Sequence, residues 1–357
     1  MKTLKDITDL KDKKVLLRVD FDVPVSDKGQ IEESFRITKQ KETLDYLVSH
    51  DAQVVMVAHI SAVTSFADLM SQLHILLGHE INFIKSVSEI GVYLEHYAGP
   101  ALVDNIRQNE GEEKNDPEFA KQLAQGFDLY VNNTFAVCHR DHASVSAVTK
   151  FLPSYAGLLI EQEVVQLKKV IEAPKEGKVV IIGGAKASTK VPVIKNLINT
   201  SEAILLGGVV ANDVLKEKGQ DMGSSVVDAN TSVLLASLDL NDSRLITPKD
   251  FIIFDNKILD VGDETMRHYI DIVSKAKLII WNGPLGLFEN PVFAKGTNEI
   301  AQAIVDSSAF KVIGGGDTIS AVDKIGLLDK FDFVSTGGGA MLAFLAGDKL
   351  PGLEALN

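Results

Sequence analysis

Short apolar runs recur along this chain, and most of them are nearly continuous rather than alternating with polar residues. Continuous apolar runs are typical of strands that are buried on both faces of a sheet. Several of the stretches between them have a helical pattern, as in residues 36–50 and 291–306. The pattern predicts strands at residues 15–19, 53–57, 128–131, 178–182, 203–206, 277–281 and 311–313.

The alternation of strands with helices predicts an α/β fold in which parallel sheets are covered on both faces. A length of 357 residues exceeds what one hydrophobic core usually supports. We therefore expect two doubly wound, Rossmann-like domains at residues 1–155 and 174–340, joined through an amphipathic helix in segment 156–173.

The composition narrows the class of protein. A net charge of -13 disfavours nucleic acid as a partner, but it leaves small anionic ligands open, since these need only a few local cations. The single cysteine, Cys138, excludes an intramolecular disulfide, fits a reducing compartment and is interpreted as a buried filler. No stretch has the length and apolarity of a signal peptide or a membrane span, so we expect a cytoplasmic enzyme without a membrane partner.

The segment Gly314-Gly315-Gly316-Asp317-Thr318 lies between a predicted strand and a helical stretch. Glycines let the backbone approach an anion closely, and a helix N-terminus offers free N–H groups and a positive dipole end. An aspartate is favourable beside phosphate when Mg²⁺ lies between them, because Mg²⁺ in nucleotide sites takes a carboxylate together with phosphate oxygens. The segment therefore predicts a Mg²⁺–nucleotide site in an enzyme that transfers phosphoryl groups.

A second glycine turn, Gly183-Gly184-Ala185-Lys186, follows the strand at 178–182, and Lys190 comes one helical turn later. Residues four apart share a helix face, so both lysines could reach one polyphosphate. The alternative is a structural turn with solvated lysines, and the glycine segment at another strand end favours the phosphate interpretation. The pattern has neither the Gly-Lys-Ser/Thr ending of a P-loop nor the spacing of a dinucleotide fingerprint.

Two further turns in the second half, residues 282–286 and 335–340, also follow strand-like runs. The first could wrap a ligand, with Glu289 nearby to accept ribose hydroxyls, and the second could bind phosphate through backbone N–H groups. In both cases a turn that the backbone alone requires is the alternative.

Charged residues in the first half suit an anionic ligand. Arginine forms bidentate hydrogen bonds with phosphate or carboxylate groups, although a single arginine is more often an ordinary surface residue. The histidines of residues 139–142 lack a Cys or Glu cluster at ligand spacing, which disfavours a metal site. The candidates for anion recognition are Arg36, His59, Arg107 and Arg140, beside the strand-end Asp20.

Taken together, these segments resemble the phosphoglycerate kinase family. The resemblance begins at residues 15–24 (VLLRVDFDVP), includes 110–123 (EGEEKNDPEFAKQL) and ends at 350–352 (LPG). Further family motifs are matched in the family's order, so the resemblance covers essentially the whole chain. These motifs are at residues 139–144, 183–190, 281–289, 314–318 and 335–340.

The resemblance implies a first domain that binds 3-phosphoglycerate or 1,3-bisphosphoglycerate and a second that binds Mg²⁺ with ADP or ATP. It also implies a hinge that closes the domains across a cleft, and a tail, residues 341–357, that returns to the first domain. The implied enzyme is a monomeric glycolytic kinase with a carboxyl group as acceptor. No general base is expected, because that carboxylate is already ionised.

The family pattern also implies roles for individual residues. The triose substrate would be held by Asp20, Asp22, Arg36, His59, Arg107 and Arg140. The nucleotide would be held by Gly183, Gly184, Lys186, Lys190, Gly207, Gly208, Asn282, Pro284, Glu289, Gly315, Gly316, Asp317 and Thr318, with Asp317 as the Mg²⁺ ligand. The catalytic groups at the transferring phosphoryl would be Arg36, Lys186, Gly314 and Gly338.

Several positions depart from the family pattern. Ala62 stands where an arginine is usual, and Asp22 replaces an asparagine at a site for an anion. A lost charged hydrogen bond costs about 1.5–3 kcal/mol, which predicts roughly 10- to 100-fold weaker triose binding unless a residue such as Lys28 or Arg18 compensates. Other departures include Gln108, Asn133, Thr134, Ala136, Val209 and Thr189, the last in place of an aspartate.

Three functions are therefore compatible with the sequence. The first is a phosphoglycerate kinase that uses ADP or ATP with Mg²⁺. The second is a catalytically weakened or inactive nucleotide-binding paralogue, which the replacement at Ala62 would explain. The third is a kinase for a different small acid.

Overall fold

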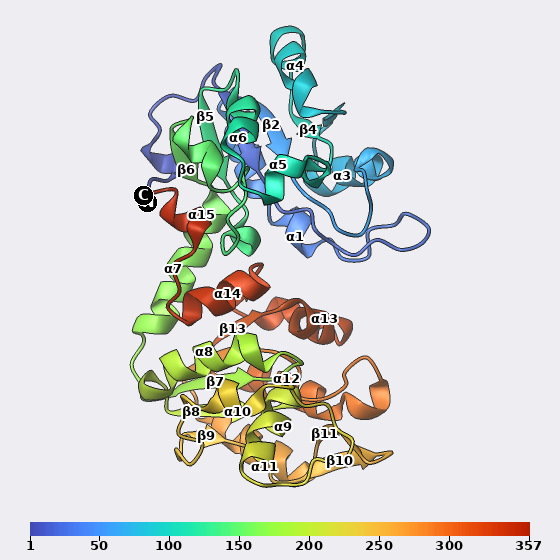
Figure 1. The fold of residues 1–357 in the computed structure, drawn as a ribbon, viewed down its shortest axis with the longest axis vertical. Helices are drawn as coiled ribbons and strands as arrows, with labels where there is room; N and C mark the ends of the chain where they lie inside the picture. Colours follow the sequence, from blue (N-terminus) through green and yellow to red (C-terminus); the bar gives the residue numbers. More distant parts are fainter. The chain divides into compact units, whose positions relative to one another are not determined.

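The computed structural model describes residues 1–357, and the chain divides into two compact units (Figure 1). The first unit is Met1–Val165 together with Lys349–Asn357, and the second is Gln166–Asp348. The helix α7 (Leu158–Glu172) begins in the first unit and ends in the second. No helix combines the length and apolar character that crossing a membrane requires.

The first unit is built on a six-stranded sheet in which every pairing is parallel. The chain starts in the middle at β1 and builds outward in both directions, which is the doubly wound arrangement. In spatial order the strands are β3 (Asn82–Ile84), β4 (Ala101–Val103), β2 (Gln53–Val57), β1 (Lys14–Arg18), β5 (Leu129–Asn132) and β6 (Ser154–Ala156).

Both faces of this sheet are covered. Val15 and Leu17 pack in one apolar cluster with Leu44, whereas Leu16 points to the other face and is equally buried. This accounts for the continuous apolar run of β1, since a strand covered on both sides has no solvent-facing positions. The helices of the unit are α1 (Phe35–Thr38), α2 (Lys41–Ser49), α3 (Met70–Leu77), α4 (Ile90–His96), α5 (Glu110–Glu113), α6 (Pro117–Ala124) and α15 (Pro351–Glu354).

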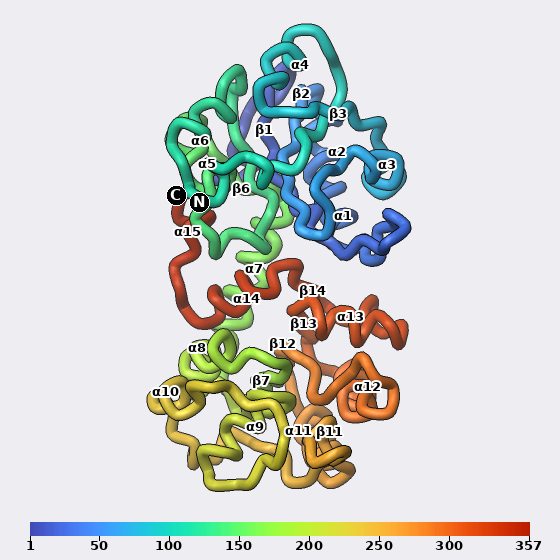
Figure 2. The backbone as a smooth tube through the Cα atoms, turned by 45° about the vertical axis from the view of Figure 1, so that its right-hand side comes forward, coloured from blue at the N-terminus to red at the C-terminus, as the bar shows by residue number.

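The end of the chain belongs to the first unit. In Figures 1 and 2 the two termini lie side by side next to α15. The N–H of Gly352 donates to the Cys138 carbonyl at 2.9 Å, and the N–H of Lys2 donates to the Leu356 carbonyl at 3.4 Å. The last residues are therefore bonded both to the segment after β5 and to the N-terminus.

The second unit has a second six-stranded parallel sheet, which starts at β7 and again builds outward in both directions. Its strands in spatial order are β14 (Phe333–Ser335), β13 (Phe310–Gly314), β12 (Leu278–Asn282), β7 (Lys178–Ile182), β8 (Ala203–Leu206) and β9 (Leu245–Ile246). A separate antiparallel hairpin pairs β10 (Phe251–Phe254) with β11 (Lys257–Val261).

Helices cover this sheet on both faces as well. Val179 and Ile181 share a cluster with Tyr269 and Ile300, whereas Val180 is buried outside that cluster. The helices are α8 (Ala187–Leu197), α9 (Gly208–Glu217), α10 (Thr231–Leu235), α11 (Asp263–Ser274), α12 (Lys295–Asp306), α13 (Gly316–Lys324) and α14 (Gly338–Leu345).

The predicted α/β fold with two parallel-sheet domains is confirmed. The prediction of one helical stretch at residues 36–50 is wrong, because α1 ends at Thr38 and α2 begins at Lys41. The side-chain amide of Gln40 donates to the Arg36 carbonyl at 3.1 Å, which is the acceptor that a continuous helix would give to the Gln40 N–H. Similarly, the stretch 291–306 is a 3₁₀ turn at Pro291–Phe293 followed by α12.

Candidate functional site

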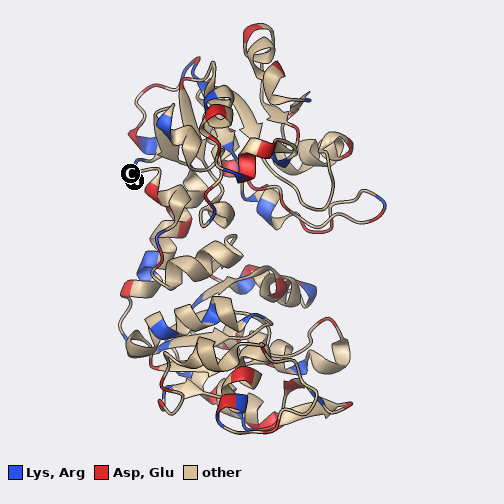
Figure 3. Cartoon of the chain, in the orientation of Figure 1, with Lys and Arg blue, Asp and Glu red and all other residues tan.

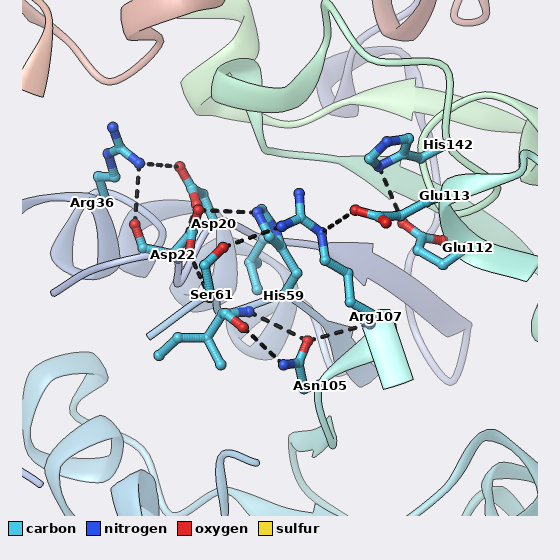
Figure 4. Close-up of polar contacts among 12 residues, drawn as sticks. Asp20, Asp22, Arg36, His59, Ser61, Asn105, Arg107, Glu112, Glu113 and His142 are labelled. Atoms are coloured by element: carbon cyan, nitrogen blue, oxygen red, sulfur yellow. Dashed lines mark hydrogen bonds and ion pairs between the residues drawn. The ribbon is translucent and has the colours of Figure 1, made fainter. Parts of the chain in front are cut away.

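The predicted anion-binding residues of the first unit gather at one edge of its sheet. Asp20 and Asp22 follow β1, His59 follows β2, Arg107 lies in a 3₁₀ turn after β4, and Arg140 comes after β5. Because these strands are parallel, their carboxyl ends meet at the same edge, where open α/β sheets bind ligands. Figure 4 shows this group apart from Arg140, with Arg36 reaching it from α1. We call these residues the first site.

Arg18 sets the orientation of His59. The guanidinium Nη2 of Arg18 lies 3.2 Å from His59 Nδ1, and a guanidinium can only donate. Nδ1 therefore accepts, and the imidazole proton is on Nε2, which faces the Asp22 carboxylate at 3.2 Å. Burial lowers the pKa of His59, and the Arg18 charge lowers it too, whereas the contact with Asp22 raises it. The net effect is a lowered pKa, so the ring is neutral at neutral pH.

The Asp22 carboxylate joins the segments after β1 and β2. Besides its contact with His59, it accepts a hydrogen bond from the Ser61 N–H at 2.8 Å. Burial raises the pKa of the Asp22 carboxyl, but the contacts with His59 and Ser61 outweigh it and hold the pKa well below the usual range. Asp22 is therefore an anion at neutral pH, inside a group of residues expected to bind an anion.

Two arginines of the first site are partly committed to protein acceptors. Arg36 Nη1 donates to the Asp22 carbonyl at 3.1 Å and lies 3.9 Å from Asp20 Oδ2. Arg107 Nη1 donates to Ser61 Oγ at 3.1 Å, and its Nε is 3.2 Å from a carboxylate oxygen of Glu113. The third nitrogen, Arg107 Nη2, is buried without a hydrogen-bond partner, which leaves a donor for a ligand.

Two arginines, Arg107 and Arg140, are neighbours on one side of the first site, with the Glu113 carboxylate beside Arg107. Burial lowers the pKa of Arg107, and the nearby Arg140 charge lowers it further. Burial lowers the pKa of His139 and of His142 too, and the Arg140 charge acts in the same direction on both. The lowered pKa values leave both histidines neutral at neutral pH, so Arg107 and Arg140 are the neighbouring cations that favour the binding of an anion between them.

A buried chain of hydrogen bonds supports the first site, and the sequence did not predict it. Arg18 Nε donates to Ser144 Oγ at 2.8 Å, and Ser144 Oγ donates to Glu112 Oε1 at 2.6 Å. Arg18 is 1% exposed and Glu112 is fully buried. Glu112 comes from α5, which stands out as acidic in Figure 3. The sequence contains one signal for these hydrogen bonds, which is the arginine within the apolar run of β1, because a buried charge needs acceptors.

Arg18 does not take the place of the arginine expected at position 62. Its guanidinium is bound to Ser144, to His59 and to the Val19 carbonyl, so it has no exposed donor for a ligand. The alternative, Lys28, is an exposed lysine in the turn between β1 and α1. Arg18 therefore does not compensate for Ala62.

In the second unit, the predicted glycine turns lie at the carboxyl ends of neighbouring strands and bond to one another. The Gly183 N–H donates to the Asn282 carbonyl at 3.0 Å, and the Gly184 N–H donates to the Pro284 carbonyl at 2.9 Å. The Gly208 N–H donates to the Leu285 carbonyl at 2.9 Å. A Cβ on Gly183 would collide with the backbone of residues 283 and 284, so the approach of these turns requires glycine. We call these turns, with the start of α13, the second site.

A pocket of about 190 Å³ opens between these turns and the hairpin. Gly184, Gly208 and Asp317 line its polar end, and Glu289 also lines it. The rest of the lining is mainly apolar and includes Val226, Phe251, Ile258 and Leu285. A polar end with glycine turns and an apolar remainder suits a phosphorylated ligand with a flat apolar group.

Lys190 and Lys186 differ in their surroundings. Lys190 is 8% exposed and its ammonium donates to Asn282 Oδ1. Burial lowers the pKa of Lys190 to about 8, against the attraction of the Asp317 carboxylate. Lys186 is exposed at the start of α8. Asn282 Nδ2 is buried without a partner, so the site keeps a free donor beside Lys190.

The start of α13 fits a metal–phosphate group. Asp317 is exposed in the first turn of this helix, and Gly315 has a φ of 96°, a conformation that favours glycine. A Cβ built on Gly338, at the start of α14, would be 3.9 Å from the Gly315 Cα, so the two helix starts are neighbours. No group of three or more His, Cys, Asp or Glu side chains is arranged to hold a metal ion by itself. One carboxylate plus phosphate oxygens is the ligand set that Mg²⁺ takes in nucleotide sites.

Comparisons with known proteins agree with one another. The family model described as phosphoglycerate kinase matches residues 4–348. The phosphoglycerate kinase of Acidobacterium capsulatum is 38% identical over 400 residues, which cover 99% of this chain and 98% of the relative. That of Roseiflexus castenholzii is 38% identical over 393 residues, covering 100% and 99%.

Solved structures show the same similarity. The crystal structure of phosphoglycerate kinase from Pyrococcus horikoshii OT3 has a TM-score of 0.89 and 30% sequence identity, and it covers 100% of this chain and 98% of the other. The structure of phosphoglycerate kinase from Coxiella burnetii has a TM-score of 0.84 and 31% identity, covering 99% and 98%.

Proposed function

The chain belongs to the phosphoglycerate kinase family, and from that premise we propose that it transfers a phosphoryl group reversibly between 1,3-bisphosphoglycerate with ADP and 3-phosphoglycerate with ATP. One observation carries the proposal beyond the family. Each of the two sheets has a site at the carboxyl ends of its strands, and the chemistry of the two sites is complementary. The first presents arginines, and the second presents glycine turns beside a largely apolar pocket.

In the first site, the triose substrate would bind with its phosphate towards the neighbouring arginines Arg107 and Arg140. Arg107 Nη2 has no protein partner and can donate to a phosphate oxygen. The reacting carboxylate would then lie towards Arg36. His59 Nε2 has no hydrogen-bond partner in the protein and would donate to that carboxylate. Asp20 and Asp22 hold Arg36 in place through the contacts described above.

In the second site, the nucleotide would bind with its base in the apolar part of the pocket and its phosphates towards Lys186, Lys190 and Asp317. Glu289 would accept hydrogen bonds from the ribose. The remaining contacts would come from Gly183, Gly184, Gly207, Gly208, Asn282, Pro284, Gly315, Gly316 and Thr318. Mg²⁺ held by Asp317 would supply positive charge to the phosphate oxygens.

Catalysis in this proposal rests on positioning and on charge. The acceptor is a carboxylate that is already ionised, so no side chain has to remove a proton. Arg36, Lys186 and the N–H groups at Gly314 and Gly338 would stabilise the charge that spreads over the oxygens of the transferring phosphoryl group. Since these groups come from both units, domain closure that excludes water is part of the proposal.

A coupled assay with 3-phosphoglycerate and Mg-ATP, with both substrates titrated, tests the proposal. We expect turnover well above that of the Lys186→Ala variant. No turnover above this control at millimolar substrate would refute the kinase, and Mg-ADP binding without triose-dependent turnover would instead identify an inactive paralogue. We further propose that the enzyme is monomeric and cytoplasmic, and sedimentation at working concentration tests the first of these.

A further inference from the structure

A segment of the second unit, residues 225–231, is bonded along its length to α9. Asn212 Nδ2 donates to the Val226 carbonyl at 3.1 Å. Asp213 is fully buried, and its Oδ1 accepts from the Asp228 N–H at 2.8 Å and from the Thr231 hydroxyl at 3.3 Å. The segment therefore has a fixed backbone, and Val226 within it lines the pocket of the second site.

From this fixed position, Asp228 reaches α8. Its Oδ2 accepts a hydrogen bond from the N–H of Ala187, the first residue of that helix, at 3.0 Å. The helix has no other side chain for this purpose, since Lys186 makes no capping bond and the first turn has no acidic residue. The first N–H groups of a helix have no partner within it, and an acceptor there holds the first turn in place.

We propose that Asp228 is a positioning residue for the nucleotide, and this rests on the function proposed above. Lys186 directly precedes Ala187, and Lys190 lies one turn later, so the geometry of both lysines depends on the first turn of α8. Lys190 must keep its contact with Asn282 while it is buried. By accepting from Ala187, Asp228 fixes the helix start that carries the two lysines. It also connects this helix start to the pocket wall that contains Val226.

The negative charge of Asp228 weakens nucleotide binding, whereas its hydrogen bond to Ala187 supports it. A carboxylate near the phosphates of a nucleotide repels them, so removal of the charge alone would strengthen binding. The role as hydrogen-bond acceptor and the role as charge are separated by Asp228→Asn, which keeps an acceptor oxygen, and Asp228→Ala, which keeps neither. In the positioning proposal, the alanine variant binds nucleotide more weakly and the asparagine variant does not.

The test measures Mg-ADP affinity by titration calorimetry on the full chain. We expect about fivefold weaker binding for Asp228→Ala, equivalent to about 1 kcal/mol, and binding within about twofold of wild type for Asp228→Asn. Adding Thr189→Asp to the alanine variant places a carboxylate in the first turn of α8, which should stabilise the helix start without restoring the Asp228 contact. The matched control is Asp221→Ala, whose carboxylate accepts only from the Gly223 N–H at 2.9 Å in the preceding turn.

Two further measurements distinguish positioning from a loss of fold. Amide exchange at residues 187–190 should become faster in Asp228→Ala and recover with Thr189→Asp, while the KM for 3-phosphoglycerate stays unchanged in every variant. Affinity in Asp228→Ala equal to or tighter than wild type would overturn the proposal, as would an asparagine variant as weak as the alanine variant. Wild-type protein that binds no Mg-ADP would instead refute the proposed function itself.

Discussion

Replacing Asp22 by asparagine should strengthen binding of the triose substrate and weaken the fold. The Asp22 carboxylate is an anion in the first site, within 3.2 Å of His59 Nε2 and bonded to the Ser61 N–H at 2.8 Å. The Asp22→Asn variant keeps the shape of the side chain and removes its charge. It also leaves one acceptor oxygen in place of two. Either the Ser61 N–H or the contact of His59 Nε2 therefore loses its acceptor.

The two effects can be estimated separately. A unit charge about 6 Å from a bound anion, at an effective dielectric constant of about 40, contributes about 1.4 kcal/mol, so its removal lowers the KM for 3-phosphoglycerate about tenfold. The donor that loses its acceptor costs about 1–2 kcal/mol of the free energy of unfolding. The KM for ATP should not change, because Asp22 belongs to the other unit from the second site.

The stability loss should depend on pH in a defined direction. The folded pKa of Asp22 is below its usual value, so its contribution to stability is fully present above about pH 4 and is lost as the pH falls towards the folded pKa. The asparagine variant never has this contribution. The difference in unfolding free energy between wild type and variant should therefore be largest near pH 7 and shrink below about pH 4.

The coupled assay and urea unfolding measure these effects. The matched control is Asp128→Asn, which makes the same change of charge at the opposite end of the strands, where its Oδ2 accepts from the Lys14 N–H at 2.7 Å. The control should leave the KM for 3-phosphoglycerate unchanged. A folded Asp22→Asn variant whose KM equals or exceeds that of wild type would refute the reasoning that Asp22 faces the bound anion.

Three other predictions follow from buried or exposed charges. Arg18→Met removes the buried guanidinium that donates to Ser144 Oγ, and should lower the unfolding free energy of the first unit by about 1.5–3 kcal/mol in urea. The change should have less effect on Trp281 fluorescence, which reports the second unit. Mg-ADP affinity should fall as the pH rises through about 8, because Lys190 loses its charge there, and the Lys190→Met variant should lack this dependence. Asp317→Ala should abolish the Mg²⁺ dependence of nucleotide binding with an unchanged melting temperature, since Asp317 is exposed.

The central strands could be predicted from sequence because burial on both faces leaves a local pattern. Residues 53–57 and 178–182 were predicted as strands, and they are β2 and β7. The edge strands β3 and β9 were not predicted, since with three and two residues they are too short to show periodicity. They are strands because a neighbouring strand pairs with them, which is information that lies elsewhere in the chain.

The candidate sites show the same division between local and distant information. The glycine turns of the second site could be located because a strand followed by glycines and a helix is a local pattern. The hydrogen bonds from Arg18 to Ser144 and from Ser144 to Glu112 span 126 and 32 residues, and they join β1, the segment after β5 and α5. The bond from Ala187 to Asp228 likewise spans 41 residues, and only the fold brings its ends together.

The substitutions at positions 22 and 62 should act together rather than independently. Ser61 donates its N–H to Asp22, so a side chain introduced at the next residue, Ala62, starts beside that carboxylate. In the Ala62→Arg variant the new guanidinium would pair with Asp22 instead of a substrate, and the KM for 3-phosphoglycerate should fall by no more than about twofold. Once Asp22→Asn removes the competing charge, the same arginine becomes available to the substrate. The fall in the KM for 3-phosphoglycerate in the double variant should then exceed the product of the falls in the two single variants. The coupled assay on all four proteins measures this coupling, and purely multiplicative effects would show that the two positions do not share a ligand.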